Sequence, residues 1–254
     1  MARSRPRPTL STVLDIPAIS ALTFDCYGTL VDWETGILTT VKEVLQRNGG
    51  QAPSGEELLR MYAEWEAWHE SDKYLSYRDV LSLTLMAIAR RCGVPELPAQ
   101  DQNALTESLP RWPIFHDARS FLTSARFHYP HPPCICSNID DDLWAATRNA
   151  LAVSLGWVVT AQYCCSYKPN PRHFRVALAL LDLQPHQVLH VAESRRHDIE
   201  PAKRLGFQTC WVNRHKSRPG PSASGEGDAL PDIEVANLDE LMSILKIKRQ
   251  DRSN

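Results

Sequence analysis

The chain has 254 residues, of which 43% are hydrophobic and 23% charged, and its formal net charge is −2. This length and composition are typical of a soluble globular protein with one α/β core and a smaller second unit. The near-neutral charge gives no reason to expect nucleic acid or an anionic membrane as a partner, and no apolar run approaches a membrane span. The seven cysteines lack zinc-site spacing, so we expect buried, reduced thiols.

The N-terminal segment 1–19 is rich in Arg, Pro and Ser and has no apolar signal-peptide core, which favours a flexible arm and a cytoplasmic location. The first strand pattern follows at Ala21–Phe24 and ends at Asp25 and a Tyr-Gly-Thr turn. Ligands of parallel α/β sheets bind at the carboxyl ends of the strands, where the Asp25 carboxylate and the Thr29 hydroxyl would lie. An ordinary strand-to-turn junction is the alternative interpretation.

A block of helical patterns comes next. Ser54 begins a Ser-x-x-Glu capping box, and apolar residues recur at helical spacing before and after it. We predict helices over 36–48, 54–70, 76–91 and, more weakly, 99–109. A contiguous helical insert in an otherwise alternating chain is typical of a cap domain.

Strands and helices alternate again from about Asp117. The predicted strands cover 133–136, 157–159, 188–192 and 209–212, and helical patterns separate them. This alternation predicts a right-handed, mostly parallel sheet. The fold class is therefore α/β. We expect a Rossmann-like three-layer core over 20–34 and 111–246, an all-helical cap over 35–110, and a flexible Ser/Pro/Gly-rich loop over 216–229.

Polar residues follow three of the later strand patterns. Ser137 and Asn138 come directly after the second strand and could bind an anion or cap a helix. Lys168 lies in a turn that enters a helix, where an exposed lysine is the ordinary alternative. Glu193 and Asp198 bracket a turn and a helix start, and Asp198 could be an N-cap there.

Four segments resemble, in order, the motifs of the haloacid dehalogenase superfamily: Asp25-Cys26-Tyr27-Gly28-Thr29, Ser137-Asn138, Lys168-Pro169 and Glu193 to Asp198. The resemblance covers about Thr23 to Asn213. It implies a hydrolase in which Asp25 is the nucleophile and Ser137 binds the anionic part of a small-molecule substrate. It also implies that the ammonium of Lys168 steadies developing negative charge, together with Thr29 and Asn138.

The residue two positions after the nucleophile separates branches of this superfamily. Its phosphatases have a second aspartate there as general acid, whereas this chain has Tyr27, a poor acid at neutral pH. Asp-x-Tyr-Gly-Thr resembles the 2-haloacid dehalogenase branch, in which halide leaves without protonation. The resemblance therefore implies that a small organic acid is hydrolysed through an ester, without a cofactor. Asp198 and Ser194 would position or activate the water.

Two departures keep alternatives open. The family's phosphatases hold magnesium with two aspartates five residues apart, and this chain has Glu193 and Asp198 at those places. The second hypothesis is therefore a magnesium-dependent phosphatase that uses Asp25, Glu193 and Asp198. In the dehalogenase hypothesis, Glu193 and Tyr27 are instead assigned to substrate binding. The dehalogenase branch also has an arginine early in the cap, where this chain reads Glu64 to Glu70 without one. A catalytically idle binding homologue is the third hypothesis. Dimers through cap helices are common in this branch.

Overall fold

The computed structural model describes residues 14–71, 73–216 and 227–250. Most of the predicted arm over 1–19 and of the predicted loop over 216–229 therefore lies outside the described residues. Residues 16–18 form a 3-10 turn, and Leu14 and Ile16 pack against the hydrophobic core. This part of the predicted arm is bound to the core because packing removes its apolar side chains from water.

A six-stranded, fully parallel sheet forms the centre of the molecule, in the order β3-β2-β1-β4-β5-β6. The strands are β1 (Ala21–Phe24), β2 (Cys134–Ser137), β3 (Val158–Thr160), β4 (Val188–Ala192), β5 (Gln208–Val212) and β6 (Ile233–Val235). Within this order Thr23 of β1 is opposite Cys134 on one side and His190 on the other. The predicted α/β class with a Rossmann-like parallel sheet is confirmed.

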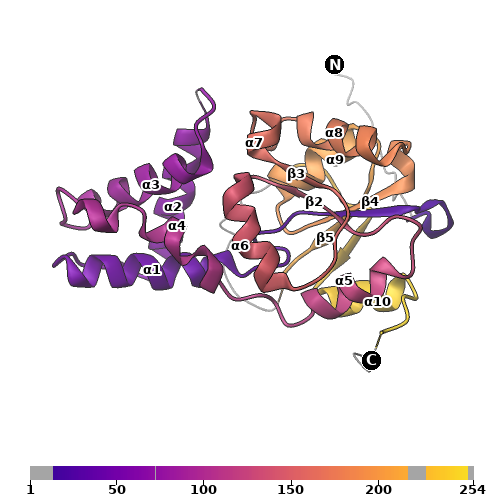
Figure 1. Cartoon of the computed structure of the whole chain (residues 1–254), viewed down its shortest axis with the longest axis horizontal. Coiled ribbons are helices and arrows are strands. Elements are labelled where there is room, and N and C mark those ends of the chain that lie inside the picture. The colour runs from indigo at the N-terminus through magenta and orange to yellow at the C-terminus, as the bar shows by residue number, and fades with distance from the viewer. Residues whose placement is uncertain (1–13, 72, 217–226, 251–254) are drawn as a thin grey trace, which may run out of the picture.

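Helices cover both faces of the sheet, which explains why its central strands β1, β2 and β4 are buried along their whole length. In Figure 1, α5 (Ala118–Arg126) and α10 (Leu238–Ile244) lie on one face, and α8 (Arg172–Leu181) and α9 (Glu200–Arg204) lie on the other. Side chains alternate along β1, so Leu22 and Phe24 join the larger core cluster and Ala21 joins the smaller one with Phe174. The two clusters give three layers.

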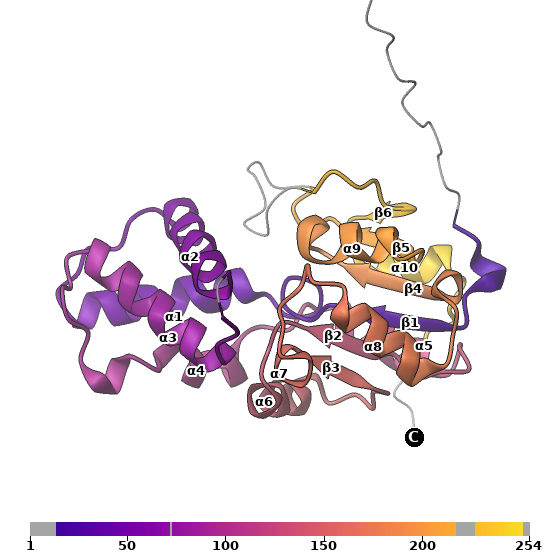
Figure 2. The same cartoon turned by 90° about the horizontal axis from the view of Figure 1, so that it is seen from above.

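Capping side chains mark where the first three α-helices after β1 begin. The first four α-helices are α1 (Trp33–Arg47), α2 (Gly55–Glu70), α3 (Tyr77–Arg91) and α4 (Ala104–Ser108), which we call the helical unit; α6 (Asp141–Leu151) follows β2. Asp32, Ser54 and Ser76 cap α1, α2 and α3 by accepting a hydrogen bond from the backbone three residues on. Figure 2 shows the helical unit beside the sheet rather than on either face.

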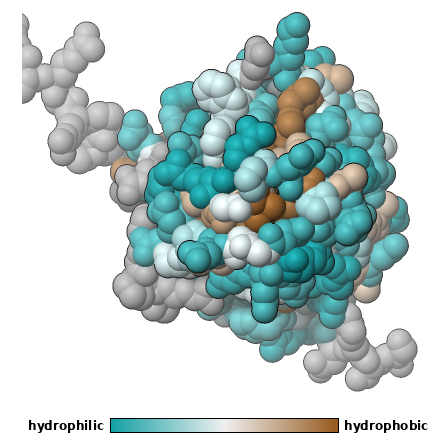
Figure 3. All heavy atoms as spheres, turned by 90° about the vertical axis from the view of Figure 1, so that its left-hand side faces the viewer, coloured by the Kyte–Doolittle hydropathy of each residue, from teal (hydrophilic) through white to brown (hydrophobic). Residues whose placement is uncertain are grey.

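Two chain segments side by side join the helical unit to the sheet. The Asp32 N–H donates to the Pro113 carbonyl at 2.8 Å, and the Phe115 N–H donates to the Leu30 carbonyl at 3.0 Å. Val31 and Ile114 form an antiparallel bridge between these bonds. The outer face of the helical unit is mostly hydrophilic, with a small hydrophobic strip near its centre (Figure 3).

Some local structure differs from the sequence prediction. The weak helix over 99–109 is split into a 3-10 turn and the short α4, and two short elements, β6 and α7 (Ala161–Cys164), have no predicted counterpart. Six of the seven cysteines are buried, but Cys165 is exposed and its φ is 45°, because it ends α7 in a left-handed turn. Within the described ranges, no helix is both long and apolar enough to cross a bilayer.

Candidate active site

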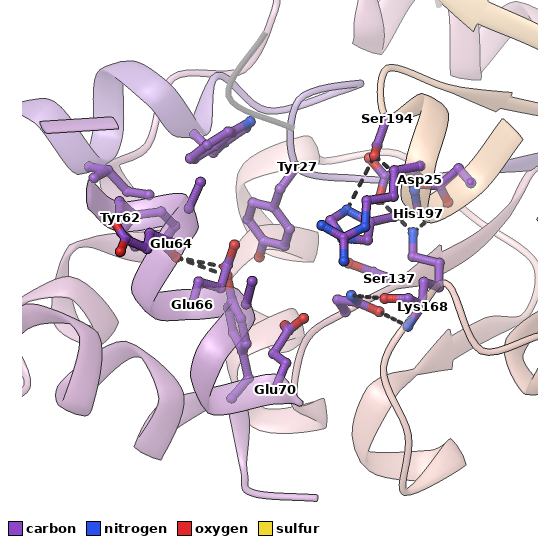
Figure 4. A pocket seen from close by; sticks show the side chains of 18 of the residues that line it. Asp25, Tyr27, Tyr62, Glu64, Glu66, Glu70, Ser137, Lys168, Ser194 and His197 are labelled. Atoms are coloured by element: carbon purple, nitrogen blue, oxygen red, sulfur yellow. Dashed lines mark hydrogen bonds and ion pairs between the residues drawn. The ribbon is translucent and has the colours of Figure 1, made fainter. Parts of the chain in front are cut away.

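A cavity of about 340 Å³ lies between the helical unit and the carboxyl edge of the sheet. Asp25, Ser137, Lys168 and Ser194 reach it from the sheet side, and Tyr62, Glu64, Glu66 and Glu70 reach it from α2 (Figure 4). Strands β1, β2 and β4 all end here. From β1 the chain continues to β2 and β3 on one side of the sheet, and from β4 it continues to β5 and β6 on the other. Open parallel sheets bind ligands at such a reversal of strand order.

Three charged side chains form the floor of this cavity. The Nζ of Lys168 lies 2.8 Å from Oδ1 of Asp25 and 2.6 Å from Oδ1 of Asp198, and it also donates to the Cys136 carbonyl at 2.9 Å. The Lys168 side chain is only 1% exposed. One buried ammonium therefore bridges two carboxylates with all three of its donors in use.

The turn after β1 fixes the second oxygen of the Asp25 carboxylate. The Thr29 hydroxyl donates to Oδ2 of Asp25 at 2.9 Å and accepts from the Glu193 N–H at 2.9 Å. Gly28 makes the turn possible, since its φ is +97°, a value that residues with a Cβ rarely adopt. Thr29 thus orients the carboxylate of Asp25, the nucleophile candidate, and connects the end of β1 to the end of β4.

Asp198 has a second buried partner that the sequence did not reveal. His190, in the middle of β4, places Nε2 3.1 Å from Oδ1 of Asp198, and its Nδ1 lies 2.9 Å from the Thr23 hydroxyl. The ring therefore connects Asp198 to the Thr23 hydroxyl of the neighbouring strand. The only sequence signal was a histidine inside an otherwise apolar strand.

The pKa values of Asp25 and Asp198 are shifted in opposite directions, although both carboxylates contact Lys168. Burial would raise the pKa of Asp198, but the Lys168 charge and the His190 hydrogen bond outweigh it and lower that pKa to about 2. Burial raises the pKa of Asp25, the Lys168 ammonium opposes this shift, and the charge on Asp198 adds to it. The pKa of Lys168 is raised despite its burial, because both carboxylates face it. Asp198 is therefore ionised at neutral pH, and Asp25 is the more basic carboxylate of the pair.

Ser137 and Asn138 do different things at the end of β2. Asn138 accepts from the Lys168 N–H at 2.7 Å and donates to the Lys168 carbonyl at 3.2 Å, so it holds the lysine turn in place. The Ser137 hydroxyl lines the cavity, is fully buried, and has no hydrogen-bond partner among the described residues. A buried hydroxyl without a partner is costly unless a ligand satisfies it.

The turn after β4 supplies three further side chains to the cavity. Ser194 accepts from the His197 N–H at 3.1 Å and lies 3.2 Å from Nδ1 of the same ring (Figure 4). Burial lowers the pKa of His197 to about 4, so its imidazole is neutral at pH 7. Arg196 also lines the cavity and is exposed. Sequence reasoning missed His197 and Arg196, although both lie inside the fourth motif.

Tyr27 forms part of the cavity wall, where a phosphatase of the family would have its second aspartate. Its hydroxyl shares a 2.6 Å hydrogen bond with Thr147, and its ring meets Trp112 edge to face. Burial raises the pKa of Tyr27 well above its ordinary value. Its proton is therefore poorly available to a leaving group.

The Glu193 carboxylate lies on the outer side of the Gly28 turn. A Cβ at Gly28 would lie 3.2 Å from Oε2 of Glu193, and Glu193 lines a second cavity of about 270 Å³ with Arg214. Asp25, Glu193 and Asp198 therefore do not converge on one point, and Lys168 occupies the space between the two aspartates. Among the described residues, no group of three or more His, Cys, Asp or Glu side chains could hold a metal ion.

A buried ion pair outside the cavity fixes the turn that carries Thr29. Arg214 pairs with Asp117 at 2.7 Å and donates to the Thr29 carbonyl at 2.6 Å. Asp117 also accepts from the Leu238 N–H at 2.7 Å, which ties α10 to the same point. No local sequence pattern predicts this pair, because Asp117 and Arg214 are 97 positions apart.

Comparison with known proteins assigns the family. A model described as haloacid dehalogenase-like hydrolase matches residues 19–206. The chain belongs to this family of hydrolases. Its match covers the four motifs up to Asp198, together with the whole helical unit.

Similarity to individual family members is low but spans most of the chain. The chain is 26% identical to (S)-2-haloacid dehalogenase 2 of Pseudomonas sp. strain CBS-3, over 92% of this chain and 99% of that protein. It is also 26% identical to a phosphoserine phosphatase of Thermus thermophilus, over 61% of this chain and 60% of that protein. The crystal structure of an L-2-haloacid dehalogenase matches with a TM-score of 0.76 at 22% identity, covering 91% and 100% of the two chains. This last similarity shows the fold.

Proposed function

We propose that this hydrolase releases halide from a small 2-haloacid-type substrate through an ester with Asp25, and that the helical unit acts as the cap over its site. In the first step the Asp25 carboxylate attacks the carbon that carries the halogen. A C–O bond forms, the C–halogen bond breaks, and halide leaves with the bonding electron pair. Thr29 and Lys168 hold the two Asp25 oxygens, so the nucleophile is oriented before the substrate arrives.

In the second step water attacks the carbonyl carbon of the Asp25 ester. The alcohol leaves, the Asp25 carboxylate is restored, and one proton is released to solvent. Asp198 stays ionised beside Lys168, so it holds that ammonium in place and can orient the attacking water. The neutral ring of His197, oriented by Ser194, is the base candidate that lines the cavity.

The observation that carries this proposal is the environment of Tyr27. A leaving alkoxide needs a proton, and the group beside Asp25 is a buried phenol already engaged with Thr147. Halide leaves without a proton, so the site suits it. In the magnesium-dependent phosphatase alternative, Asp25 and Asp198 would share a metal ion, and Lys168 already engages one oxygen of each carboxylate. The full-length relative, named a 2-haloacid dehalogenase, supports the same choice.

The direct test is to measure halide release from 2-chloropropionate beside phosphate release from p-nitrophenyl phosphate, each with EDTA and with added magnesium. We expect halide release that EDTA leaves unchanged. Phosphate release that EDTA abolishes would support the phosphatase instead. No turnover of any substrate in a broad panel of haloacids and phosphate esters would support an idle binding homologue.

The pH dependence of kcat/KM should report the ionisation of the nucleophile. Burial raises the pKa of Asp25 above its ordinary value, with Lys168 opposing and Asp198 adding to the shift. Only the ionised form attacks carbon, so activity should be full above this pKa and fall as the pH drops through it. We expect the acid limb of the profile to lie above the ordinary aspartate value, and to persist in His197→Gln. A limb below that value would contradict the assignment.

A further inference from the structure

The wall of the cavity opposite Asp25 is acidic. Glu66 and Glu70 are four residues apart on α2, so they lie on the same side of the helix, and Glu70 points toward the sheet side in Figure 4. Glu64 also lines the cavity, but its side chain is 62% exposed and pairs with Arg60 at 3.5 Å. With Asp25 and Asp198, the lining has five carboxylates and only two cations, Lys168 and Arg196.

The two wall carboxylates retain unused acceptor capacity. Oε1 of Glu66 accepts from the hydroxyls of Tyr62 at 2.9 Å and Tyr77 at 2.6 Å, which fixes its direction. The Glu70 carboxylate has no hydrogen bond or ion pair within the ranges that the structure describes. Burial raises the pKa of both groups, and the charge on Glu66 raises that of Glu70 further, against the opposing Lys168 and Arg196. A cation placed between them would relieve this repulsion.

Two other features of the same cavity indicate a ligand. Five aromatic side chains line it together with the carboxylates: Tyr27, Trp33, Tyr62, Tyr77 and Trp112. Aromatic faces beside carboxylates are a suitable environment for an ammonium or alkylammonium group. At the opposite end, the buried Ser137 hydroxyl has no partner among the described residues and can serve an acid group or halogen.

We propose that the substrate carries a cationic group, an ammonium or alkylammonium, bound between Glu66 and Glu70 while its electrophilic carbon faces Asp25. The position of that carbon rests on the function proposed above; the cation subsite rests on the wall itself. A plain 2-haloacid has no cationic group to place against Glu66 and Glu70, whereas a zwitterionic one has a cation that would stabilise their ionised forms. In this site the helical unit contributes acids where the dehalogenase branch is expected to contribute an arginine.

Binding of three non-reacting ligands of similar shape tests the subsite without any chemistry. Benzylammonium, benzyl alcohol and benzoate present a cation, a neutral group and an anion on the same ring. By calorimetry with the wild-type protein, we expect benzylammonium to bind at least about tenfold more tightly than benzyl alcohol, a difference of about 1.4 kcal/mol, and benzoate to bind most weakly. Equal binding of the first two, or tightest binding of benzoate, would overturn the proposal.

Matched variants locate the effect on α2. Glu66→Gln and Glu70→Gln should each reduce the preference for benzylammonium, and the double variant should remove it. Glu56→Gln makes the same charge change at an exposed position of the same helix and should leave the preference intact. Loss of the preference in Glu56→Gln, or its survival in the double variant, contradicts the subsite. Glu70→Asp, which keeps the charge, should retain part of the preference and serves if the amide variants fold poorly.

A kinetic comparison then connects the subsite to the reaction. For 3-amino-2-chloropropionate against 2-chloropropionate, we expect kcat/KM to be at least about tenfold higher, with the gain lost in Glu66→Gln/Glu70→Gln. If neither compound releases halide but benzylammonium still binds selectively, the proposed reaction is wrong and the cation subsite stands. If halide is released without selectivity for the amine, the reaction stands and the subsite is wrong.

Discussion

Asp25→Asn should lower kcat for halide release by at least about 10³-fold, since the amide cannot form the ester and nucleophile replacements remove most of the rate enhancement. The variant should remain folded, because the amide oxygen of asparagine can still accept from Lys168, and only the hydrogen bond that Thr29 donates is lost. Asp182→Asn changes an exposed aspartate at the end of α8 and should leave kcat unchanged. Full turnover by Asp25→Asn would refute the nucleophile assignment.

Isotope labelling separates the ester route from direct attack by water. In a single turnover in H₂¹⁸O, the ester route puts the heavy oxygen into the Asp25 carboxyl group, and the product receives the oxygen that Asp25 held before. Mass spectrometry of the peptide containing Asp25 should therefore show the label. Label in the product of the first turnover, with none in the peptide, would mean that water attacks the substrate directly.

Lys168→Met should cost about 3–5 kcal/mol of unfolding free energy, the usual result of removing one partner from a buried ion pair. The substitution leaves Asp25 and Asp198 facing each other without the ammonium that bridges them. Urea unfolding measures this free energy. The rate of halide release should also fall, because loss of the Lys168 charge raises the pKa of Asp25 further. The matched control is Lys216→Met, which breaks an exposed pair with Glu234 at 3.7 Å and should cost about 0–1 kcal/mol.

A second substitution tests whether the cost comes from the stranded charge. Adding Asp198→Asn to Lys168→Met removes one of the two unpaired carboxylates, so the double variant should be more stable than Lys168→Met alone. Activity should not return, because the ammonium beside the nucleophile is still missing. If the double variant loses stability additively, Lys168 stabilises the protein through packing rather than charge.

The sheet and the position of Asp25 could be predicted because they depend on local patterns. An apolar run that stops at a turn marks β1 and places Asp25 at its end, and the alternation of runs marks a parallel sheet. The edge strand β6 was not predicted, since it has three residues with one apolar face and follows a Ser/Pro/Gly-rich stretch. The domain boundaries chosen from sequence remain a prediction.

The site was only partly predictable, because side-chain direction and pairing across the sheet are not local properties. Motif spacing placed Glu193 beside Asp198, but the backbone after β4 turns its carboxylate toward the second cavity. His190 became a partner of Asp198 only when β4 and the following turn were placed in space. On α2, sequence reasoning noted a missing arginine, and only the fold showed that Glu66 and Glu70 face the nucleophile across one cavity.

The paired connection at Val31 and Ile114 has a consequence for how this protein can change over generations. The chain leaves the core for the helical unit and returns to it at one bridge, so the two ends of this insert lie side by side. For the core, the insert is equivalent to a loop that is already closed. Substitutions on α2 can then alter the wall that meets the substrate without shifting the strand ends that hold Asp25 and Lys168. In the proposed function, most of the wall that recognises the substrate and the groups that cleave the bond would then lie on different parts of the chain and could vary separately.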